Sequence, residues 1–272
     1  MALLEINKDT CRKCGICAGV CPAGIIVYRE NKYPRPVPGA DSFCLRCGHC
    51  VAACPTGSFI HAEVPLEQCL LIDPALQVSF EQCAQLVRSR RSIRFYRDKE
   101  VPREDIARII DVARYAPTGH NSQEVQWTVF ENRDEIREFT RIGVAWMRDM
   151  MEKHRHMDLI FGPVVESIES GHDIFLRDAP AVVVVHAEQG NPIAAIDCTI
   201  ALSYFDLAAS SLGLGCCWAG FFQTAAASFP PMIEAVALPE GRQVYGSLMV
   251  GYPKYGYKRT PVRRPASIDW RS

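Results

Sequence analysis

A run of four cysteines occurs twice near the N-terminus. Both runs have the spacing C-x2-C-x2-C-x3-C-P, and Cys44 lies 33 residues after Cys11, as every cysteine of the second run does after its counterpart. The first run is Cys11, Cys14, Cys17 and Cys21, and the second is Cys44, Cys47, Cys50 and Cys54. A motif that recurs at one fixed offset indicates an internal duplication. Such regular spacing is not needed for packing, so we expect the eight thiols to bind metal.

The N-terminal residues and the overall charge indicate in which cellular compartment these thiols lie and which partners the chain does not bind. The first ten residues have neither a basic stretch nor a long apolar one, and no run approaches 18 apolar residues, so we expect a cytoplasmic protein that makes no membrane contact. The cytosol keeps thiols reduced, which favours metal ligands over disulfides. With 30 basic and 31 acidic side chains, the chain as a whole is not expected to bind nucleic acid.

The duplicated segment strongly resembles the two-cluster 4Fe-4S ferredoxins. In those proteins the fourth cysteine of each run binds the cluster of the other run. The resemblance implies one cluster held by Cys11, Cys14, Cys17 and Cys54, and a second held by Cys44, Cys47, Cys50 and Cys21. Structural zinc is the alternative, because paired C-x2-C motifs also form zinc sites. The two x2 spacings, the x3 spacing and the proline, all repeated, fit a ferredoxin better.

The sequence also predicts the roles of several residues near the cysteines and of two cysteines outside the runs. Apolar side chains should exclude water from the clusters, and these are Ile16, Val20, Ile25, Leu45, Val51 and Ile60. His49 lies inside the second run, but cysteines already supply every ligand, so we expect it at the surface. Cys69 and Cys83 have no ligand spacing and are expected to be buried thiols.

The length of 272 residues suggests about two domains. We expect a two-cluster ferredoxin domain at 1–62, a linker and helix at 63–84, and a second domain at 85–272. The helix of the linker should begin near Ser79, because Phe80, Cys83, Leu86 and Val87 follow at helical spacing.

Five arginines fall within ten residues at the start of the second domain, from Arg88 to Arg97. Guanidinium groups bind phosphate in a bidentate manner, and the serine between them adds a donor. From composition alone, a phosphate site and a solvated basic turn are equally good interpretations. A helical pattern follows at 101–113, then a turn-rich segment at 116–123 and an expected strand at 125–130.

Four motifs in this order make residues 85–272 resemble the nitroreductase family of FMN-dependent oxidoreductases. They are R-R-S-I-R at 90–94, A-P-T-G-H-N-S-Q at 116–123, G-L-G-C-C-W-A-G-F at 213–221, and G-Y-P-K at 251–254 followed by a basic stretch. Each motif is weak alone, whereas the four in sequence are a strong signal. Many members of the family carry glutamate where this chain has Ala219, so any role of that side chain is absent here.

The resemblance implies where FMN binds. Arg90, Ser92, Arg94 and the backbone of Arg91 are expected to hold the phosphate and the pyrimidine side of the ring, with Arg259 or Arg263 completing the phosphate site. Pro117, Thr118, Gly119 and Asn121 are expected to reach the flavin from the neighbouring subunit, because the family builds its sites at a dimer interface. Trp218, Ala219 and Gly220 lie at the flavin edge, where the backbone of the last two approaches N5.

The remaining features favour packing over chemistry. The glycines at 213–220 lack dinucleotide-loop spacing and follow a helical pattern, which argues against a Rossmann fold. Cys216 and Cys217 are better interpreted as small buried residues than as redox thiols. The Met-rich run at 134–175 is either core or a cover that selects substrate, and its histidines (His154, His156 and His172) could donate protons. Strands are expected at 181–186 and 245–250, with a long helix at 193–212 between them.

We therefore expect an α+β protein: an N-terminal ferredoxin-like two-cluster module fused to a nitroreductase-like mixed sheet flanked by helices. We expect the protein to be an FMN-dependent oxidoreductase that passes electrons from two 4Fe-4S clusters to FMN and on to a nitroaromatic, a quinone or a similar acceptor. We also expect it to be a homodimer. The external donor is reduced ferredoxin or NAD(P)H, and the direction of flow stays open. An electron carrier or redox sensor for a protein partner is the alternative, and no catalytic residue is assigned.

Overall fold

The computed structural model describes residues 2–271 and divides the chain into two compact units. The first unit comprises Met1–Gln77 together with Gly119–Ser122, and the second comprises Val78–Thr118 and Gln123–Ser272. The division after Gln77 falls inside the segment 63–84 that we expected to be a linker.

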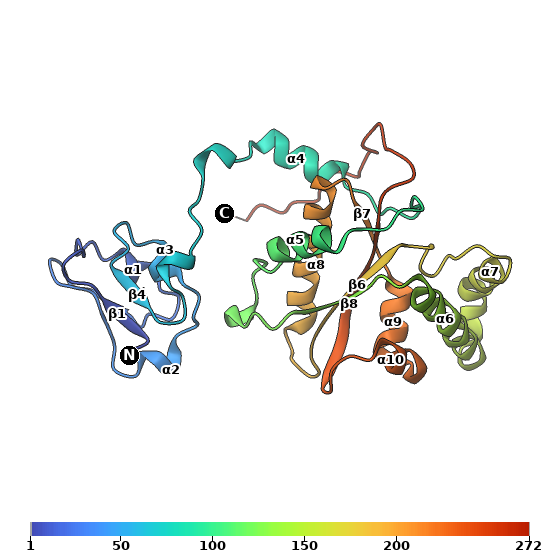
Figure 1. The fold of residues 1–272 in the computed structure, drawn as a ribbon, viewed down its shortest axis with the longest axis horizontal. Coiled ribbons are helices and arrows are strands. Elements are labelled where there is room, and N and C mark those ends of the chain that lie inside the picture. Colours follow the sequence, from blue (N-terminus) through green and yellow to red (C-terminus); the bar gives the residue numbers. More distant parts are fainter. Residues whose placement is uncertain (1, 272) are drawn as a thin grey trace. The chain divides into compact units, whose positions relative to one another are not determined.

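The first unit is built from two short antiparallel ladders and single-turn helices (Figure 1). Strand β1 (Leu4–Ile6) pairs with β4 (Phe59–His61), with Leu4 opposite His61, and β2 (Ile26–Val27) pairs with β3 (Arg35–Pro36). The helical turns are α1 (Ile16–Gly19), α2 (Ala40–Phe43), α3 (His49–Ala52), η1 (Leu66–Gln68) and η2 (Pro74–Leu76). Gly15 and Gly48 precede α1 and α3 with φ of 74° and 71°, which glycine adopts without steric cost.

A small core lies between these elements. It contains Leu4, Ile25, Ile26, Val51 and Phe59 together with two of the cysteines, Cys17 and Cys50. The expected burial of Ile25 and Val51 is confirmed, but Ile16, Val20 and Ile60 are about two-fifths exposed. Ile60 alternates along β4 with the buried Phe59 and His61, so strand geometry turns it outward.

Helix α4 (Phe80–Ser89) opens the second unit and confirms the helix expected after Ser79. Its start is closed by a capping box, in which the Ser79 hydroxyl accepts from the Gln82 N–H and the Gln82 side chain accepts from the Ser79 N–H. The helix buries none of its side chains. The expectation that Cys83 is a buried thiol is therefore wrong, since this cysteine is exposed, and Cys69 is half-buried.

A four-stranded sheet forms the centre of the second unit, in the order β5-β6-β8-β7. The strands are β5 (Gln126–Phe130), β6 (Ala181–Glu188), β8 (Arg242–Gly251) and β7 (Gly215–Trp218). All three pairings are antiparallel, so the α+β class is confirmed but the expected mixed sheet is an antiparallel one in the described residues. Strand β8 begins before the expected residue 245, because Arg242 and Gln243 continue its ladder with β6.

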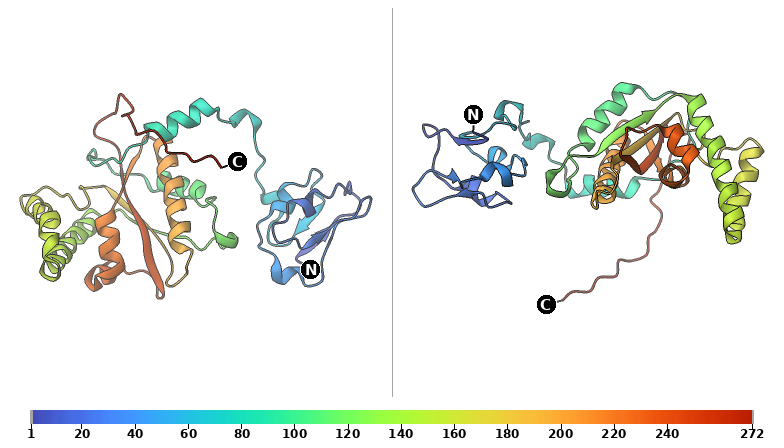
Figure 2. Two further views of the ribbon diagram at one scale, coloured as in Figure 1. Left: turned by 180° about the vertical axis from the view of Figure 1, so that it is seen from behind. Right: turned by 90° about the horizontal axis from the view of Figure 1, so that it is seen from below.

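Helices cover both faces of this sheet (Figure 1 and Figure 2). The alternating side chains of β6 separate the core into two parts, since Val182 and Val184 point to one face while Val183 and Val185 point to the other. Helices α5 (Arg103–Ala113) and α8 (Ala194–Ser211) pack on the second of these faces. The first face carries α6 (Arg133–Lys153), α7 (Asp158–Glu169), α9 (Gly220–Ser228) and α10 (Pro230–Val236), with η4 (Arg155–Met157) joining α6 to α7. No helix among the described residues has the length and apolar character needed to cross a membrane.

Candidate functional site

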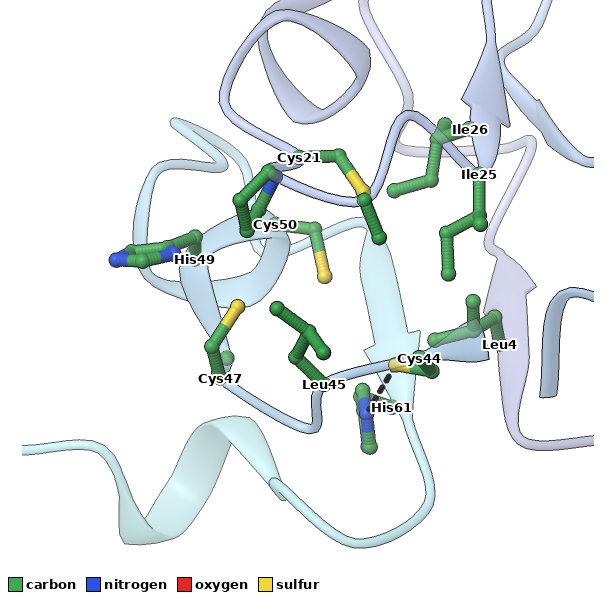
Figure 3. Close-up of a pocket in the computed structure, with 13 residues that line it drawn as sticks. Leu4, Cys21, Ile25, Ile26, Cys44, Leu45, Cys47, His49, Cys50 and His61 are labelled. Atoms are coloured by element: carbon green, nitrogen blue, oxygen red, sulfur yellow. Dashed lines mark hydrogen bonds between the residues drawn. The ribbon is translucent and has the colours of Figure 1, made fainter. Parts of the chain in front are cut away.

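Four cysteines line a small cavity in the first unit (Figure 3). They are Cys21 of the first run and Cys44, Cys47 and Cys50 of the second. The walls between the sulfurs are apolar and come from Leu4, Ile25, Ile26 and Leu45. His61 completes the lining, and its ring reaches the Cys44 sulfur. The fourth cysteine of one run thus faces the first three of the other.

A second small cavity repeats this arrangement with the roles of the runs exchanged. Its cysteines are Cys11, Cys14, Cys17 and Cys54, and its walls include Ile6, Ile16 and Phe59. Across the described part of the chain, no three histidine, cysteine or carboxylate side chains converge closely enough to hold a single metal ion. The eight sulfurs instead line the two cavities in two groups of four.

Backbone donors already point at the sulfurs of the second cavity. The Ser58 N–H donates to the Cys54 Sγ over 3.2 Å, and the Lys13 N–H donates to the Cys11 Sγ over 3.4 Å. Burial raises the pKa of Cys54, but the N–H donors of residues 56, 58 and 59 more than offset this and hold it below the usual value. Burial also raises the pKa of Cys17, and that of Cys50 to about 12, so these thiols favour a thiolate only beside a cation.

In the second unit, three of the four motifs that resemble the nitroreductase family lie in contact. They are the arginine segment, the segment that contains β7, and the residues that follow β8. The arginine segment 90–97 lies against β7, where the Ile93 N–H donates to the Cys216 carbonyl over 2.9 Å. Gly215 leaves the room that Ile93 fills, because a Cβ at Gly215 would overlap the Ile93 side chain. On its other side the segment bonds to the residues after β8, through the Arg97 N–H to Tyr252 and the Lys254 N–H to Phe95.

The arginines of this segment are held in different ways. Arg90 forms an ion pair with Asp206 over 3.2 Å, and the Asp206 side chain is 8% exposed while that of Arg90 is 32% exposed. Burial raises the pKa of Asp206, and Arg90 opposes that rise. Arg91 donates from one terminal nitrogen to the carbonyls of Arg88 and Arg90, and its Nε is buried without a hydrogen-bond partner among the described residues. Ser92 is half-buried and Arg94 is exposed.

The flavin-edge segment joins β7 to α9. Trp218 ends the strand and is 36% exposed, whereas Ala219 is buried. The Ala219 N–H donates to the Ser247 carbonyl over 3.0 Å, so this donor is engaged within the protein. Gly220 begins α9, and the first N–H groups of a helix have no acceptor inside it. Of the two expected backbone donors, the one at Ala219 is therefore already engaged, and the one at Gly220 lies in the first turn of α9.

The remaining expected residues are the loop at 117–121 and the two C-terminal arginines. The Thr118 hydroxyl accepts from the Gln123 N–H, while Pro117 is exposed. Gly119 and Asn121 group with the first unit, where the Asn121 amide donates to the carbonyls of Leu45 and Arg46 over 3.1 and 3.2 Å. Arg259 and Arg263 are exposed in the irregular C-terminal segment.

The side chains from the Met-rich run are mainly packing. Trp146 and Met147 belong to the main core of the second unit, and Met150, Met151 and Met157 pack against it. The histidines of the same region, His154, His156 and His172, are exposed. Cys216 and Cys217 are buried, as expected of packing residues, and His49 is exposed as expected.

Some important side chains gave no sequence signal. Asp206 sits in a helical pattern, and only its burial beside Arg90 reveals it. His61 lies outside every motif, although it follows the second cysteine run by a few residues. Tyr96 lies within the arginine segment and gave no signal of its own, yet its hydroxyl donates to the Ile93 carbonyl over 2.6 Å and fixes the turn of that segment.

Comparison with known proteins finds a different family in each of two parts of the chain. The sequence model described as the nitroreductase family matches residues 87–252, and one described as a 4Fe-4S dicluster domain matches residues 3–55. A protein of Archaeoglobus fulgidus with the provisional name NADH dehydrogenase/NAD(P)H nitroreductase is 26% identical over 174 residues, which are 64% of this chain and 87% of that protein. The FMN reductase [NAD(P)H] of Bacillus subtilis is 26% identical over 60% of this chain and 62% of its own length.

Among solved structures, the nitroreductase of Bacteroides fragilis with bound FMN has the same fold. Its TM-score is 0.59 at 24% identity, and the likeness covers 69% of this chain and 98% of that one. The family match spans more than half of the chain and contains the arginine segment, β7 and β8. The chain belongs to the nitroreductase family and carries a 4Fe-4S dicluster domain ahead of its nitroreductase domain.

Proposed function

We propose that this chain is an iron-sulfur flavoprotein oxidoreductase that passes electrons from two 4Fe-4S clusters to FMN and on to a small organic acceptor, such as a nitroaromatic or a quinone. The observation that carries the proposal is the pair of four-cysteine cavities in a member of the nitroreductase family. Bound clusters supply one-electron transfer, and bound FMN couples this to two-electron organic chemistry.

The chain's own residues support the two cluster sites. Each cavity is lined by three cysteines of one run and the fourth of the other, which matches the crossed ligation of two-cluster ferredoxins. Zinc at about 2.3 Å from each sulfur needs the four thiols to converge, and no three metal-binding side chains among the described residues do so. The ligands of one site are then Cys11, Cys14, Cys17 and Cys54, and those of the other are Cys21, Cys44, Cys47 and Cys50.

The second unit supports an FMN site of the expected kind. A buried Arg91 Nε without an acceptor among the described residues and an Arg90 guanidinium oriented by Asp206 offer donors for an anion such as a phosphate. Ser92 and Arg94 add donors in the same segment, and either Arg259 or Arg263 joins them. The Gly220 N–H at the start of α9 is suited to donate to an acceptor at the flavin edge.

Exposed apolar side chains support a homodimer with the loop at Pro117–Asn121 reaching the partner's FMN. Phe80 on α4 is 77% exposed and Ile196 on α8 is 61% exposed, while Val262 and Trp270 of the C-terminal segment are 97% and 86% exposed. Large apolar side chains left in water in such number are commonly covered by another chain. The donor is reduced ferredoxin or NAD(P)H, and the Bacillus subtilis relative is named for the use of NAD(P)H.

Anaerobic purification with quantification of iron, sulfide and flavin tests the proposal. We expect about eight irons per chain if both cavities bind a cubane, with one FMN per chain. Zinc in place of iron, or a preparation without flavin, contradicts the proposal. Stopped-flow reduction by NAD(P)H and by reduced ferredoxin then identifies the donor, and sedimentation reports the dimer.

Paired cysteine variants test the crossing itself. Cys14→Ser with Cys54→Ser changes two ligands of one cavity, so about four irons should remain per chain. Cys14→Ser with Cys21→Ser changes one ligand in each cavity, so both clusters are weakened and iron should fall well below that level. Equal iron in the two double variants contradicts the crossed assignment.

A further inference from the structure

A histidine donor lies against one of the two cysteine cavities. The described lining of the other cavity includes no histidine, and its side-chain contact to a sulfur is the Thr56 hydroxyl, 3.8 Å from the Cys54 Sγ. The His61 side chain is 2% exposed at the end of β4, and its Nε2 lies 3.6 Å from the Cys44 Sγ (Figure 3). Both groups line the cavity that also contains Cys21, Cys47 and Cys50. The His61 ring in this contact is therefore buried, while the Cys44 that it meets is half-buried.

The opposite nitrogen of the ring decides which partner donates. The Glu63 backbone N–H donates to the His61 Nδ1 over 3.1 Å, so Nδ1 offers a lone pair and carries no proton. A neutral imidazole has one N–H, which must then be at Nε2. The bond to Cys44 consequently runs from the Nε2–H of His61 to the sulfur, and the backbone turn after β4 holds the ring in this tautomer.

The duplication provides an internal comparison. His61 lies 33 residues after Tyr28, the same offset that relates Cys44 to Cys11. The Tyr28 hydroxyl instead donates to the Lys13 carbonyl over 2.7 Å. The Cys11 sulfur receives only the Lys13 backbone N–H, at 3.4 Å, among the residues that the structure describes. The two halves therefore share their ligands and their fold but differ in this side-chain donor.

We propose that His61 is a positioning residue that raises the reduction potential of the cluster held by Cys21, Cys44, Cys47 and Cys50. Reduction adds negative charge that is shared with the thiolate sulfurs, and an N–H donor stabilises the reduced form more than the oxidised form. The burial of the His61 ring strengthens this effect. The chain thereby sets the potentials of its two clusters separately, although their ligands are the same. The inference rests on the proposed function, since it requires a cluster in each cavity.

Redox titration of the holoprotein, followed by EPR, tests the inference with three variants. His61→Leu removes the donor, His61→Gln keeps an N–H donor, and Tyr28→Phe removes the equivalent side-chain bond in the other half, which does not reach a sulfur. In His61→Leu we expect the reduction equilibrium of one cluster to become about three- to tenfold less favourable, where tenfold corresponds to about 59 mV for one electron. The other cluster should keep its potential. His61→Gln should shift less than His61→Leu, and Tyr28→Phe should shift neither cluster.

Iron and sulfide content is measured first, because it distinguishes a failure of the proposed function from a failure of the proposed role of His61. Wild-type protein without about eight irons refutes the proposed function rather than the role of His61. With full iron content, the role of His61 is refuted if His61→Leu shifts neither cluster, shifts both equally, or moves a potential upward.

A second measurement keeps His61 and all eight cysteines, so it tests the proposal even if the His61→Leu variant loses its clusters. Holoprotein labelled with ¹⁵N-histidine is reduced and studied by pulsed EPR, in a His49→Gln background that removes the exposed histidine of the second run. A coupling between a cluster and a histidine nitrogen supports the bond from His61. Absence of that coupling in a fully reduced sample overturns it.

Discussion

Substitution of Gly15 by alanine tests how tightly the first unit is built around its cysteines. Gly15 lies between Cys14 and Cys17 with φ of 74°, and a Cβ at this position would lie 2.5 Å from the Cδ1 of Tyr28. Carbon atoms in contact prefer about 3.5–4.0 Å, so the ring must move. Its hydroxyl is bonded to the Lys13 carbonyl over 2.7 Å, which resists that movement.

Two other glycines of the same unit separate the backbone cost from the clash. Gly24 has φ of 63°, and a Cβ added there would meet no described atom within 4 Å, so Gly24→Ala costs only about 1–2 kcal/mol for the left-handed backbone. Gly15→Ala adds an overpacking cost of about 1–3 kcal/mol. Gly48→Ala should fall between them, because its Cβ would meet a flexible Val64 methyl group at 3.0 Å.

The assay is the thermal loss of cluster absorbance in the anaerobic holoprotein, with all variants scanned at one rate because unfolding with cluster loss is irreversible. For a unit of this size about 1 kcal/mol shifts Tm by about 4–8 °C, so Gly15→Ala should melt about 5–20 °C below Gly24→Ala. Iron content before the scan shows that each variant started with its clusters.

Equal midpoints for Gly15→Ala and Gly24→Ala refute the reasoning, because they leave no cost for the contact with Tyr28. A double-mutant cycle gives a second check. In a Tyr28→Ala background the ring is gone, so the added effect of Gly15→Ala should shrink to that of Gly24→Ala.

The other predictions concern the second unit. Asp206→Asn removes the carboxylate that orients Arg90, so FMN should dissociate about tenfold more readily in a fluorescence titration, and unchanged affinity argues against this role of the ion pair. Gly215→Ala should also weaken FMN binding, because the added methyl group displaces the arginine segment, whereas Gly246→Ala crowds the core elsewhere and should lower Tm with a smaller effect on FMN. Burial lowers the pKa of His186, so the unfolded chain takes up this proton first as the pH falls below about 6.5, and wild-type stability is lost there. His186→Gln should therefore show a shallower fall in urea midpoint between about pH 7.5 and pH 5.5, and parallel curves contradict the assignment.

The local elements of the second unit followed from short-range patterns. The capping box at Ser79, the apolar stripe of α5 and the valine run of β6 each carry their signal within one element, and all three formed close to the expected bounds. The start of β8 was missed, because Arg242 and Gln243 extend the strand through pairing with β6 rather than through any apolar pattern. The sheet's antiparallel pairing could not be predicted either, since strand direction depends on how distant segments meet.

Burial was harder to predict than secondary structure. Ile60 and Cys83 are apolar or weakly polar side chains that we expected inside, yet the alternation of β4 and the unpacked surface of α4 leave them exposed. The backbone of Ala219 shows the same limit, because its N–H is engaged by Ser247 from β8, a residue 28 positions away. A motif identifies the segment that is expected to bind a ligand. It does not reveal whether a distant residue of the same chain already forms a hydrogen bond with the polar group in question.

The sequence by itself determined the chemistry that the chain can support: eight thiols in a duplicated run, an arginine segment, and the order of motifs that marks the nitroreductase family. These signals are local because ligand spacing and turn residues act over a few positions. The tertiary structure brings Cys21 and Cys54 into the cavities that the ferredoxin resemblance implied for them. Only the tertiary structure decided that Asp206 holds Arg90 and that His61 rather than Tyr28 donates to a sulfur. Each of these depends on contacts between residues far apart in the sequence, which packing selects and short-range spacing does not encode.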